Sequence, residues 1–392
     1  MPINFQQAVD QIRKMGMSAR QRADALEVLR EMARALLREL AGQETELKDL
    51  VERAARLNNR LRTGMPALGR LDAAVSSAPL APGTVLLAAD GSQINPDRHA
   101  AVEFGAINVG AICLRPGQAP RETVDSKLLF YEDLYIGNAP LTEDIVALKR
   151  DLAERKLLFE LAQPHRVDGT GVVTLTDGPL ELFGDEQNNA AFKNSLVEYL
   201  EVMRRLAGSG AAAAGYVDKP RSSYVVNLLE LVLLERSAEL SKAGQEHPLF
   251  PVHDDDLYTG LLGPGQRSAV FGLHATSAAR FTNELALHFF YLNVGRANKP
   301  QLARVEIPRW VAEEVDLLAL VQSALVEQSR QMGARPYPYI LQRAHEVAVV
   351  SFEEKDQLET MIQAELRRQG VETGELSNKQ SGKNLAGRTR MK

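Results

Sequence analysis

The sequence contains a single cysteine, Cys113, and no long apolar run. With one cysteine, no disulfide can form within the chain, which is typical of proteins in a reducing compartment. No apolar stretch approaches the roughly 18 residues that a membrane-spanning helix needs, and the first residues lack the basic and apolar segments of a secretory signal. We therefore expect a cytoplasmic protein that does not act at a membrane.

The sequence also has no excess of basic over acidic residues. The 46 Lys and Arg residues are outnumbered by 51 Asp and Glu residues, and the formal net charge is −5. The surface as a whole therefore does not attract nucleic acid, and contact with DNA has to be confined to a local basic channel. Scattered basic residues are the candidates for that channel: Arg267, Arg296, Arg304 and Arg335.

The first 63 residues are predicted to form a helical arm. Ala, Leu, Glu and Arg dominate residues 4–61, which contain no proline, and apolar residues such as Leu29 and Leu36 recur at helical spacing. This pattern indicates a helical hairpin or a coiled-coil segment that packs on its own body, on a second copy or on a partner. A segment rich in Gly, Pro, Ser and Ala, residues 63–82, is predicted to be a linker.

The next 290 residues or so alternate strand and helix patterns, which predicts an α/β domain over residues 84–370 with a mixed sheet flanked by helices. The strands expected first are 84–89, 101–109, 111–115, 128–135, 171–176 and 211–217, and the helices among them are 143–161 and 188–207. Residues 377–392 contain five basic residues and no acidic one, so we expect a disordered tail that is solvated or makes weak phosphate contacts.

Two apolar runs of this domain end in an Asp-Gly pair, at Asp90-Gly91 and Asp177-Gly178. Such runs are typical of buried strands, and Asp-Gly is typical of the turn that follows. Carboxylates at the ends of neighbouring buried strands also provide the oxygen ligands that a hard divalent cation prefers. We therefore predict that Asp90 and Asp177 lie side by side and form the floor of a metal site.

A third carboxylate is expected from the helix between these strands. Glu160 lies in an apolar stretch near the end of that helix, where a carboxylate is costly to bury unless it is paired or bound to a metal. Helical periodicity also allows Glu160 to lie on the exposed stripe. Glu154 and Asp151 compete for the same role.

Two further side chains complete the candidate site. His345 lies on a predicted helix, and a nitrogen ligand added to carboxylates favours Mn²⁺ over Mg²⁺, which stays open as the alternative ion. Lys219 follows a predicted strand and is placed to hold a scissile phosphate, assisted by Arg221 and Tyr224, or to form a surface salt bridge. The acidic run at residues 254–256 is predicted to be a solvated loop.

Several motifs of the chain resemble those of the NurA nucleases of DNA end resection. The opening motif of that family resembles Asp90-Gly91-Ser92-Gln93 followed by Pro96-Asp97-Arg98-His99, and the second resembles Thr176–Leu180. Later blocks resemble Gly263–Phe271 and the stretch from Tyr337 to His345. The order of the blocks is more specific than any one of them, and the resemblance covers residues 85–350.

The resemblance implies an RNase H-like core and a Mn²⁺-dependent deoxyribonuclease with single-strand endonuclease and 5′–3′ exonuclease activity. It also implies a ring-shaped homodimer that works with a HerA-type hexameric translocase ATPase. The metal-site residues that it implies are Asp90, Glu160, Asp177 and His345, with Tyr216 and Lys219 added for catalysis.

Two other functions compete with this one. The first is a catalytically weak adaptor that docks on a hexameric DNA translocase through its helical arm. The second is an RNA-directed RNase H-like enzyme. The chain keeps every proposed acidic ligand, which favours catalysis.

Overall fold

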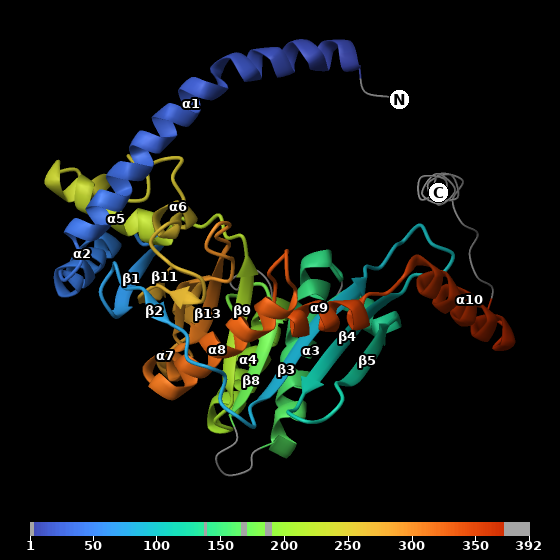
Figure 1. The fold of residues 1–392 in the computed structure, drawn as a ribbon. Coiled ribbons are helices and arrows are strands. Elements are labelled where there is room, and N and C mark those ends of the chain that lie inside the picture. The colour runs from blue at the N-terminus through green and yellow to red at the C-terminus, as the bar shows by residue number, and fades with distance from the viewer. Residues whose placement is uncertain (1–3, 137–138, 166–170, 185–189, 372–392) are drawn as a thin grey trace. The chain divides into compact units, whose positions relative to one another are not determined.

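The computed structural model describes residues 4–136, 139–165, 171–184 and 190–371 (Figure 1). The chain forms two compact units. Unit 1 comprises Met1–Pro79, Gly178–Glu181 and Gly215–Pro336, and unit 2 comprises Leu80–Asp177, Leu182–Ala214 and Tyr337–Lys392. Among the described helices, none is long and apolar enough to cross a membrane. The basic tail expected at residues 377–392 lies outside the described residues.

Unit 2 is built on a mixed sheet with the strand order β9-β8-β3-β4-β5. Its strands are β3 (Val85–Ile94), β4 (Gly105–Leu114), β5 (Arg121–Leu129), β8 (Val172–Asp177) and the first residues of β9 (Ala212–Asp218). β3, β4 and β5 are antiparallel neighbours, whereas β8 runs parallel to β3. A separate antiparallel pair joins β6 (Tyr135–Ile136) to β7 (Ala139–Pro140). The predicted mixed sheet is confirmed.

β3 and β8 form a buried parallel pair because the residues that face each other in it are mostly apolar. Val85–Ala89 of β3 and Val172–Thr176 of β8 are all buried, as expected for a parallel pair that is covered on both faces. The helices of this unit are α3 (Glu143–Ala162), α4 (Ala190–Gly208), α9 (Tyr339–Ala348) and α10 (Phe352–Arg368).

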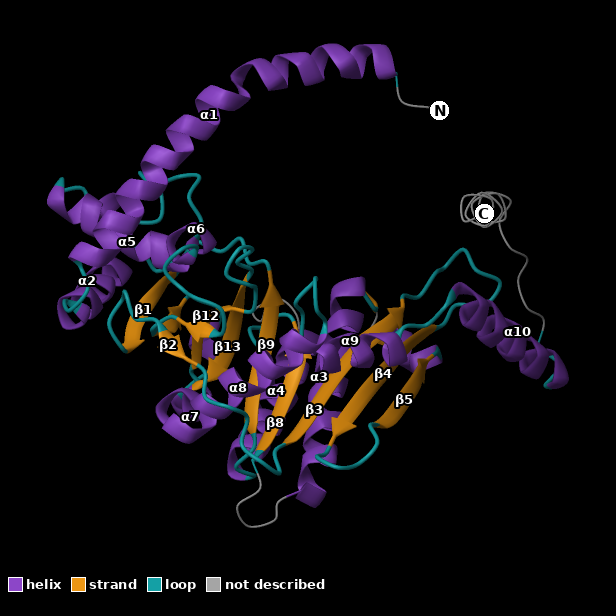
Figure 2. Ribbon diagram, in the orientation of Figure 1, coloured by secondary structure: helices purple, strands orange, loops and turns teal. Residues whose placement is uncertain are grey.

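Helices α3 and α9 cover opposite faces of this sheet (Figure 2). A Cβ atom on Gly91 would meet Arg150 of α3, whereas one on Gly110 would meet Ala348 of α9. Gly110 pairs with Asp90, the residue before Gly91. Because successive residues of a strand point to opposite faces, Gly91 and Gly110 face opposite sides of the sheet.

Unit 1 contains an antiparallel sheet and the helical arm. The sheet has the order β1-β11-β12-β13-β9, and β2 pairs with β10, which pairs with β12. The strands are β1 (Thr63–Leu68), β2 (Val75–Ser76), β10 (Gln266–Arg267), β11 (Val270–His274), β12 (Leu287–Asn293) and β13 (Leu302–Pro308). The helices are α1 (Phe5–Glu39), α2 (Glu44–Leu57), α5 (Tyr224–Arg236), α6 (Asp254–Tyr258), α7 (Arg309–Glu313) and α8 (Val315–Gln331). The segment predicted to be a helical arm contains the two helices α1 and α2.

Two strands at sheet edges differ from the sequence-based expectation. β1 lies in the segment predicted to be a linker, because Pro66 is tolerated in a strand that ends its sheet. β5 begins at Arg121, ahead of the strand predicted at 128–135. Most of its residues are exposed on both faces, so its sequence lacks the alternation that marks a half-buried strand.

The acidic run of residues 254–256 is also not a solvated loop. Asp254 is fully buried at the start of α6. Its carboxylate accepts hydrogen bonds from the backbone N–H groups of the first three residues of α5, Tyr224, Val225 and Val226. The donor–acceptor distances are 2.7 to 3.0 Å. An acid that satisfies three orphan donors at a helix N-terminus serves as a cap supplied from another element.

We expect Asp254→Ala to destabilise the protein by about 2 to 4 kcal/mol, because three buried N–H groups lose their acceptor. Urea unfolding measures the change. The neighbouring substitution Asp255→Ala removes an acid that is only partly buried and should shift the midpoint much less. Equal shifts for the two variants would contradict the capping role.

Candidate active site

Asp90 lies within β3, directly after the buried run Val85–Ala89. The sequence predicts a turn here, but β3 continues for four residues past Asp90 and stays paired with β4. Gly91 is needed for a different reason. A Cβ atom on it would lie 2.5 Å from Cγ of Arg150 and 2.8 Å from Oε1 of Glu154, both on α3. The glycine lets these side chains approach the strand beside Asp90.

Asp177 is the last residue of β8, and its place beside Asp90 follows from the strand register. The last pair of the parallel ladder joins Ala89 to Thr176, and the two aspartates come next on each strand. They therefore lie at the same level and on the same face of neighbouring strands, whose backbones are about 4.8 Å apart. The predicted adjacency is confirmed for the backbone.

The turn that was predicted after Asp177 is present. Gly178 has a φ of +90°, a left-handed conformation that glycine adopts without strain. Asp177 is exposed, whereas the side chain of Asp90 is only 18% exposed. The two Asp-Gly pairs therefore differ: one ends a strand, and the other lies within one.

His345 of α9 contacts Asp90 directly, with 2.6 Å between Nδ1 and Oδ2. The end of α9 is anchored to the sheet by two side chains that donate to the carbonyl oxygen of Ala348. Oγ of Ser92 lies 2.6 Å from this oxygen, and Nδ2 of Asn108 lies 2.8 Å from it. The structure therefore brings His345 to Asp90, and it gives Ser92 a role in holding the helix.

The C-terminal end of α9 packs directly on Gly110. The sequence predicts two strands on either side of this glycine, but β4 runs through it without a break. A Cβ atom here would lie 2.5 Å from the backbone nitrogen of Ala348, and the backbone cannot give way as a side chain can. Because Gly110 pairs with Asp90, the absence of a side chain lets α9 lie close to that carboxylate.

The carboxylate that α3 places near Asp90 is that of Glu154, which is 6% exposed. Burial raises the pKa of Glu154 to about 8, and the charges of Asp151 and Asp90 add to the rise. The nearest cation, Arg150, has its Nε 3.5 Å from Oε1 of Glu154 and also donates to Asp151 at 2.9 Å. Arg150 is thus shared between Glu154 and Asp151, and the charges of Arg150 and Arg155 together do not offset the effect of burial on the pKa of Glu154.

Glu160 is exposed, and the structure does not bring it to this place. It lies six residues beyond Glu154 on the same helix, which is about 9 Å along the axis and about a third of a turn round it. Sequence periodicity treats charged positions as solvent-facing, so it gives no sign that α3 buries Glu154 and Arg155.

The other predicted residues lie in unit 1. Tyr216 is fully buried within β9. Lys219 is 73% exposed, and its Nζ lies 3.5 Å from Oδ2 of Asp218, which matches the predicted surface salt bridge. Arg221 is exposed, whereas Tyr224 is buried beside Arg62. Tyr224 is therefore not placed to assist at a phosphate.

The basic residues predicted for a DNA channel, all in unit 1, differ in exposure. Arg296 and Arg335 are exposed, and Arg267 is partly buried. Arg304 is 7% exposed and paired with Glu306 at 2.8 Å. This buried pair excludes Arg304 from a DNA-contacting role.

The donor set near Asp90 fits a hard divalent cation in kind, since it combines carboxylate oxygens with one imidazole. As the side chains stand, no three His, Cys, Asp or Glu residues in the described ranges are grouped closely enough to hold a metal ion. Oδ2 of Asp90 is engaged by His345, and Oε1 of Glu154 is engaged by Arg150. Binding of an ion would require these contacts to open.

Three antiparallel strands followed by a parallel one, with acids at the ends of the parallel pair, define an RNase H-like α/β protein. A model of the NurA domain matches residues 84–350. The chain belongs to the NurA family. The expected family and the RNase H-like fold are thus confirmed.

Two solved structures illustrate what the chain is similar to. The crystal structure of the NurA nuclease from Sulfolobus solfataricus matches at 12% identity and a TM-score of 0.53, covering 94% of this chain and 98% of that one. The catalytic domain of human endonuclease V matches at 13% identity and a TM-score of 0.31, covering 81% and 98%. No curated protein matches the chain in sequence. Membership of the NurA family supports a nuclease, and the match to the Sulfolobus protein supports the fold.

The shifted pKa of Glu154 predicts how stability depends on pH in metal-free buffer. Between its ordinary value of 4.5 and about 8, Glu154 holds a proton in the folded protein that the unfolded chain has lost. The free energy of unfolding therefore falls as the pH rises through this range, by an amount on the order of a few kcal/mol. Urea titrations in EDTA between pH 5 and 8 measure the slope. Glu154→Gln should flatten it, and an unchanged slope in this variant would contradict the assignment.

Proposed function

We propose that this protein is a metal-dependent nuclease that cleaves DNA. Its proposed active site consists of Asp90, Glu154, Asp177 and His345. The observation that carries the proposal is the register of β3 and β8, which sets Asp90 and Asp177 side by side, with His345 against one of them. We propose Glu154 in place of Glu160, and the support for this choice is that Glu154 is a buried acid beside Gly91.

Each side chain has a separate role in this proposal. Asp90, Asp177 and Glu154 would hold the cation through oxygen atoms. A bound divalent ion would supply an activated water and stabilise the leaving oxygen of the phosphodiester. His345 now contacts Oδ2 of Asp90 through Nδ1, and once this contact opened its imidazole would offer a nitrogen to the ion. Lys219, with its exposed ammonium group, remains the proposed phosphate contact.

The finer assignments rest on the family resemblance together with single features of the chain. The imidazole of His345 favours Mn²⁺ among the divalent ions. We further propose single-strand endonuclease and 5′–3′ exonuclease activity in DNA end resection, with Tyr216 contributing to catalysis, in a cytoplasmic homodimer that works with a HerA-type translocase.

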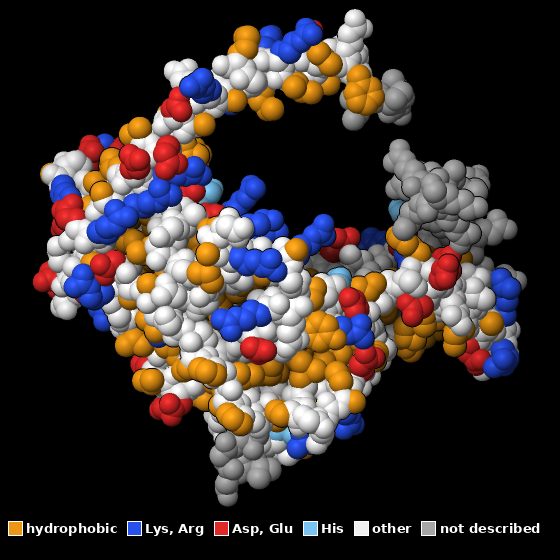
Figure 3. Space-filling view, in the orientation of Figure 1, with side chains coloured by type: hydrophobic (Ala, Val, Ile, Leu, Met, Phe, Trp, Pro, Cys, Tyr) orange, Lys and Arg blue, Asp and Glu red, His pale blue; other side chains and the backbone are white. Residues whose placement is uncertain are grey.

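The helical arm supports an association of this kind. The outer half of α1 exposes hydrophobic side chains at helical spacing (Figure 3). They include Phe5, Val9, Ile12 and Met15. A solvent-exposed apolar stripe on a helix is typical of a surface that another helix covers.

The variants Glu154→Gln and Glu160→Gln separate the two candidates on α3. We expect Glu154→Gln to lower the rate of Mn²⁺-dependent DNA cleavage about 100-fold or more, since a ligand that holds the ion in place is lost. Glu160→Gln changes an exposed side chain and should cleave within about twofold of the wild type. If Glu160→Gln instead lowered the cleavage rate and Glu154→Gln did not, Glu160 would be the metal ligand on α3.

The same assay tests the competing functions when single-stranded DNA, blunt duplex DNA and an RNA–DNA hybrid are compared. Asp90→Asn should abolish cleavage of the preferred DNA substrate. Absence of cleavage by the wild type with Mn²⁺ or Mg²⁺ would favour an adaptor, and preference for the RNA strand would favour an RNA-directed enzyme.

A further inference from the structure

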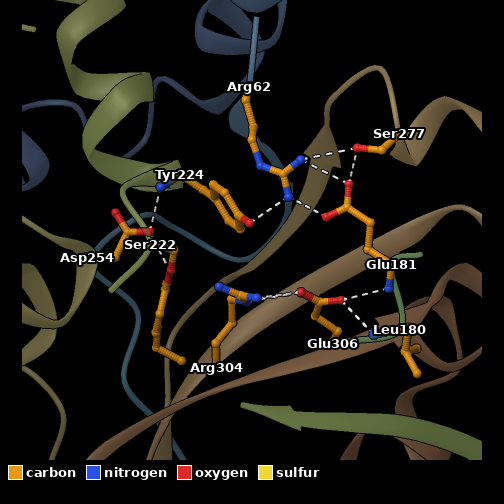
Figure 4. A network of polar contacts seen from close by, with 10 residues as sticks. Arg62, Leu180, Glu181, Ser222, Tyr224, Asp254, Ser277, Arg304 and Glu306 are labelled. Carbon is orange, nitrogen blue, oxygen red and sulfur yellow. Dashed lines mark hydrogen bonds and ion pairs between the residues drawn. The ribbon is translucent and has the colours of Figure 1, made fainter. Parts of the chain in front are cut away.

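The residues that follow Asp177 are held in unit 1 by a buried carboxylate (Figure 4). Leu180 and Glu181 direct their backbone N–H groups at Oε2 of Glu306, at distances of 2.9 Å and 3.4 Å. Glu306 lies on β13 and is 1% exposed. A buried anion that accepts hydrogen bonds from backbone N–H groups fixes the path of the backbone, because no water is available there to replace it as the acceptor.

Glu306 is itself fixed by Arg304, two residues before it on the same face of β13. Nε and Nη2 of Arg304 both donate to Oε1 of Glu306, at 3.1 Å and 2.8 Å. One oxygen of the carboxylate thus faces the arginine, and the other faces the segment after Asp177.

A second ion pair holds Glu181, whose side chain is fully buried. Arg62, which precedes β1, donates to both carboxylate oxygens, and the Nη1–Oε1 distance is 2.9 Å. Ser277 donates to Oε1 as well. The two oxygens of Glu181 therefore have fixed partners, and Glu181 cannot rotate without losing them.

The two pairs meet at the ring of Tyr224. The guanidinium carbons of Arg62 and Arg304 lie 4.9 Å and 5.0 Å from its centroid, and Arg62 donates to its hydroxyl at 2.7 Å. Two cations, two anions and one ring form a closed network, in which a change at one member displaces the others.

Such a network is a poor source of stability, because the desolvation of buried charges offsets most of their attraction. It is suited to fixing a geometry. Given the proposed function, we propose that Glu306 and Arg62 are positioning residues of the active site. They hold the chain at Leu180 and Glu181, three and four residues after Asp177, and they thereby limit the directions in which its carboxylate can meet a divalent cation.

The variant Glu306→Gln tests this proposal without relying on cleavage alone. It keeps the shape of the side chain and removes the charge that Arg304 faces. We expect Mn²⁺ binding to the DNA-free protein, measured by calorimetry, to weaken about 10- to 100-fold, as is usual when a partner behind a metal ligand is lost. Binding of DNA in EDTA should not change, and cleavage should recover in part at high Mn²⁺.

Glu230→Gln is the matched control. Glu230 is also a buried carboxylate of unit 1, 3% exposed, and it accepts the backbone N–H of Leu249 and pairs with His247. It lies on α5, and both of these partners belong to the segment at residues 247–249. Both variants should lose stability, but Glu230→Gln should keep the wild-type affinity for Mn²⁺.

If Glu306→Gln does not fold, Arg62→Lys takes its place, because lysine keeps the charge but cannot bridge both oxygens of Glu181 and the hydroxyl of Tyr224. A folded variant with wild-type Mn²⁺ affinity would overturn the positioning role, even if its melting temperature falls. A wild-type protein that binds no divalent ion and cleaves no DNA would refute the proposed function itself, and this inference with it.

Discussion

The parallel pairing of β3 with β8 is the constraint on which the proposed site depends. Parallel strands in register place corresponding residues at one level. Because Ala89 pairs with Thr176, the next residues on the two strands, Asp90 and Asp177, are neighbours. The flanking runs Val85–Ala89 and Val172–Thr176 are buried on both faces, so the pair lies within the core. A rigid base for two like charges follows from apolar packing alone.

The rest of the site brings further charge to this base. α9 supplies His345 and lies close only because Gly110 has no side chain, and α3 supplies Glu154 from the opposite face. Burial raises the pKa of Glu154, and the charges of Arg150 and Arg155 offset this rise only in part. Acids crowded together without enough counter-charge are held in place by the surrounding fold, and they gain most from a divalent cation.

Much of this was predictable from the sequence, for reasons that particular residues make clear. The runs before Asp90 and Asp177 are apolar enough to be read as buried strands, and their order within the motif blocks gives the family. Glu154 was named only as a competitor of Glu160, because helical periodicity assigns charges to the solvent side. β1 and Asp254 were missed since a proline and an acidic run are typical of loops, and only tertiary pairing overrides that tendency.

A crystal structure of the protein soaked with Mn²⁺ tests the central claim most directly. The account predicts an anomalous peak whose ion lies about 2.0 to 2.6 Å from oxygen atoms of both Asp90 and Asp177. Carboxylates of Asp90 and Asp177 more than about 8 Å apart could not share one ion with ligand distances in that range, and such a structure would contradict the account.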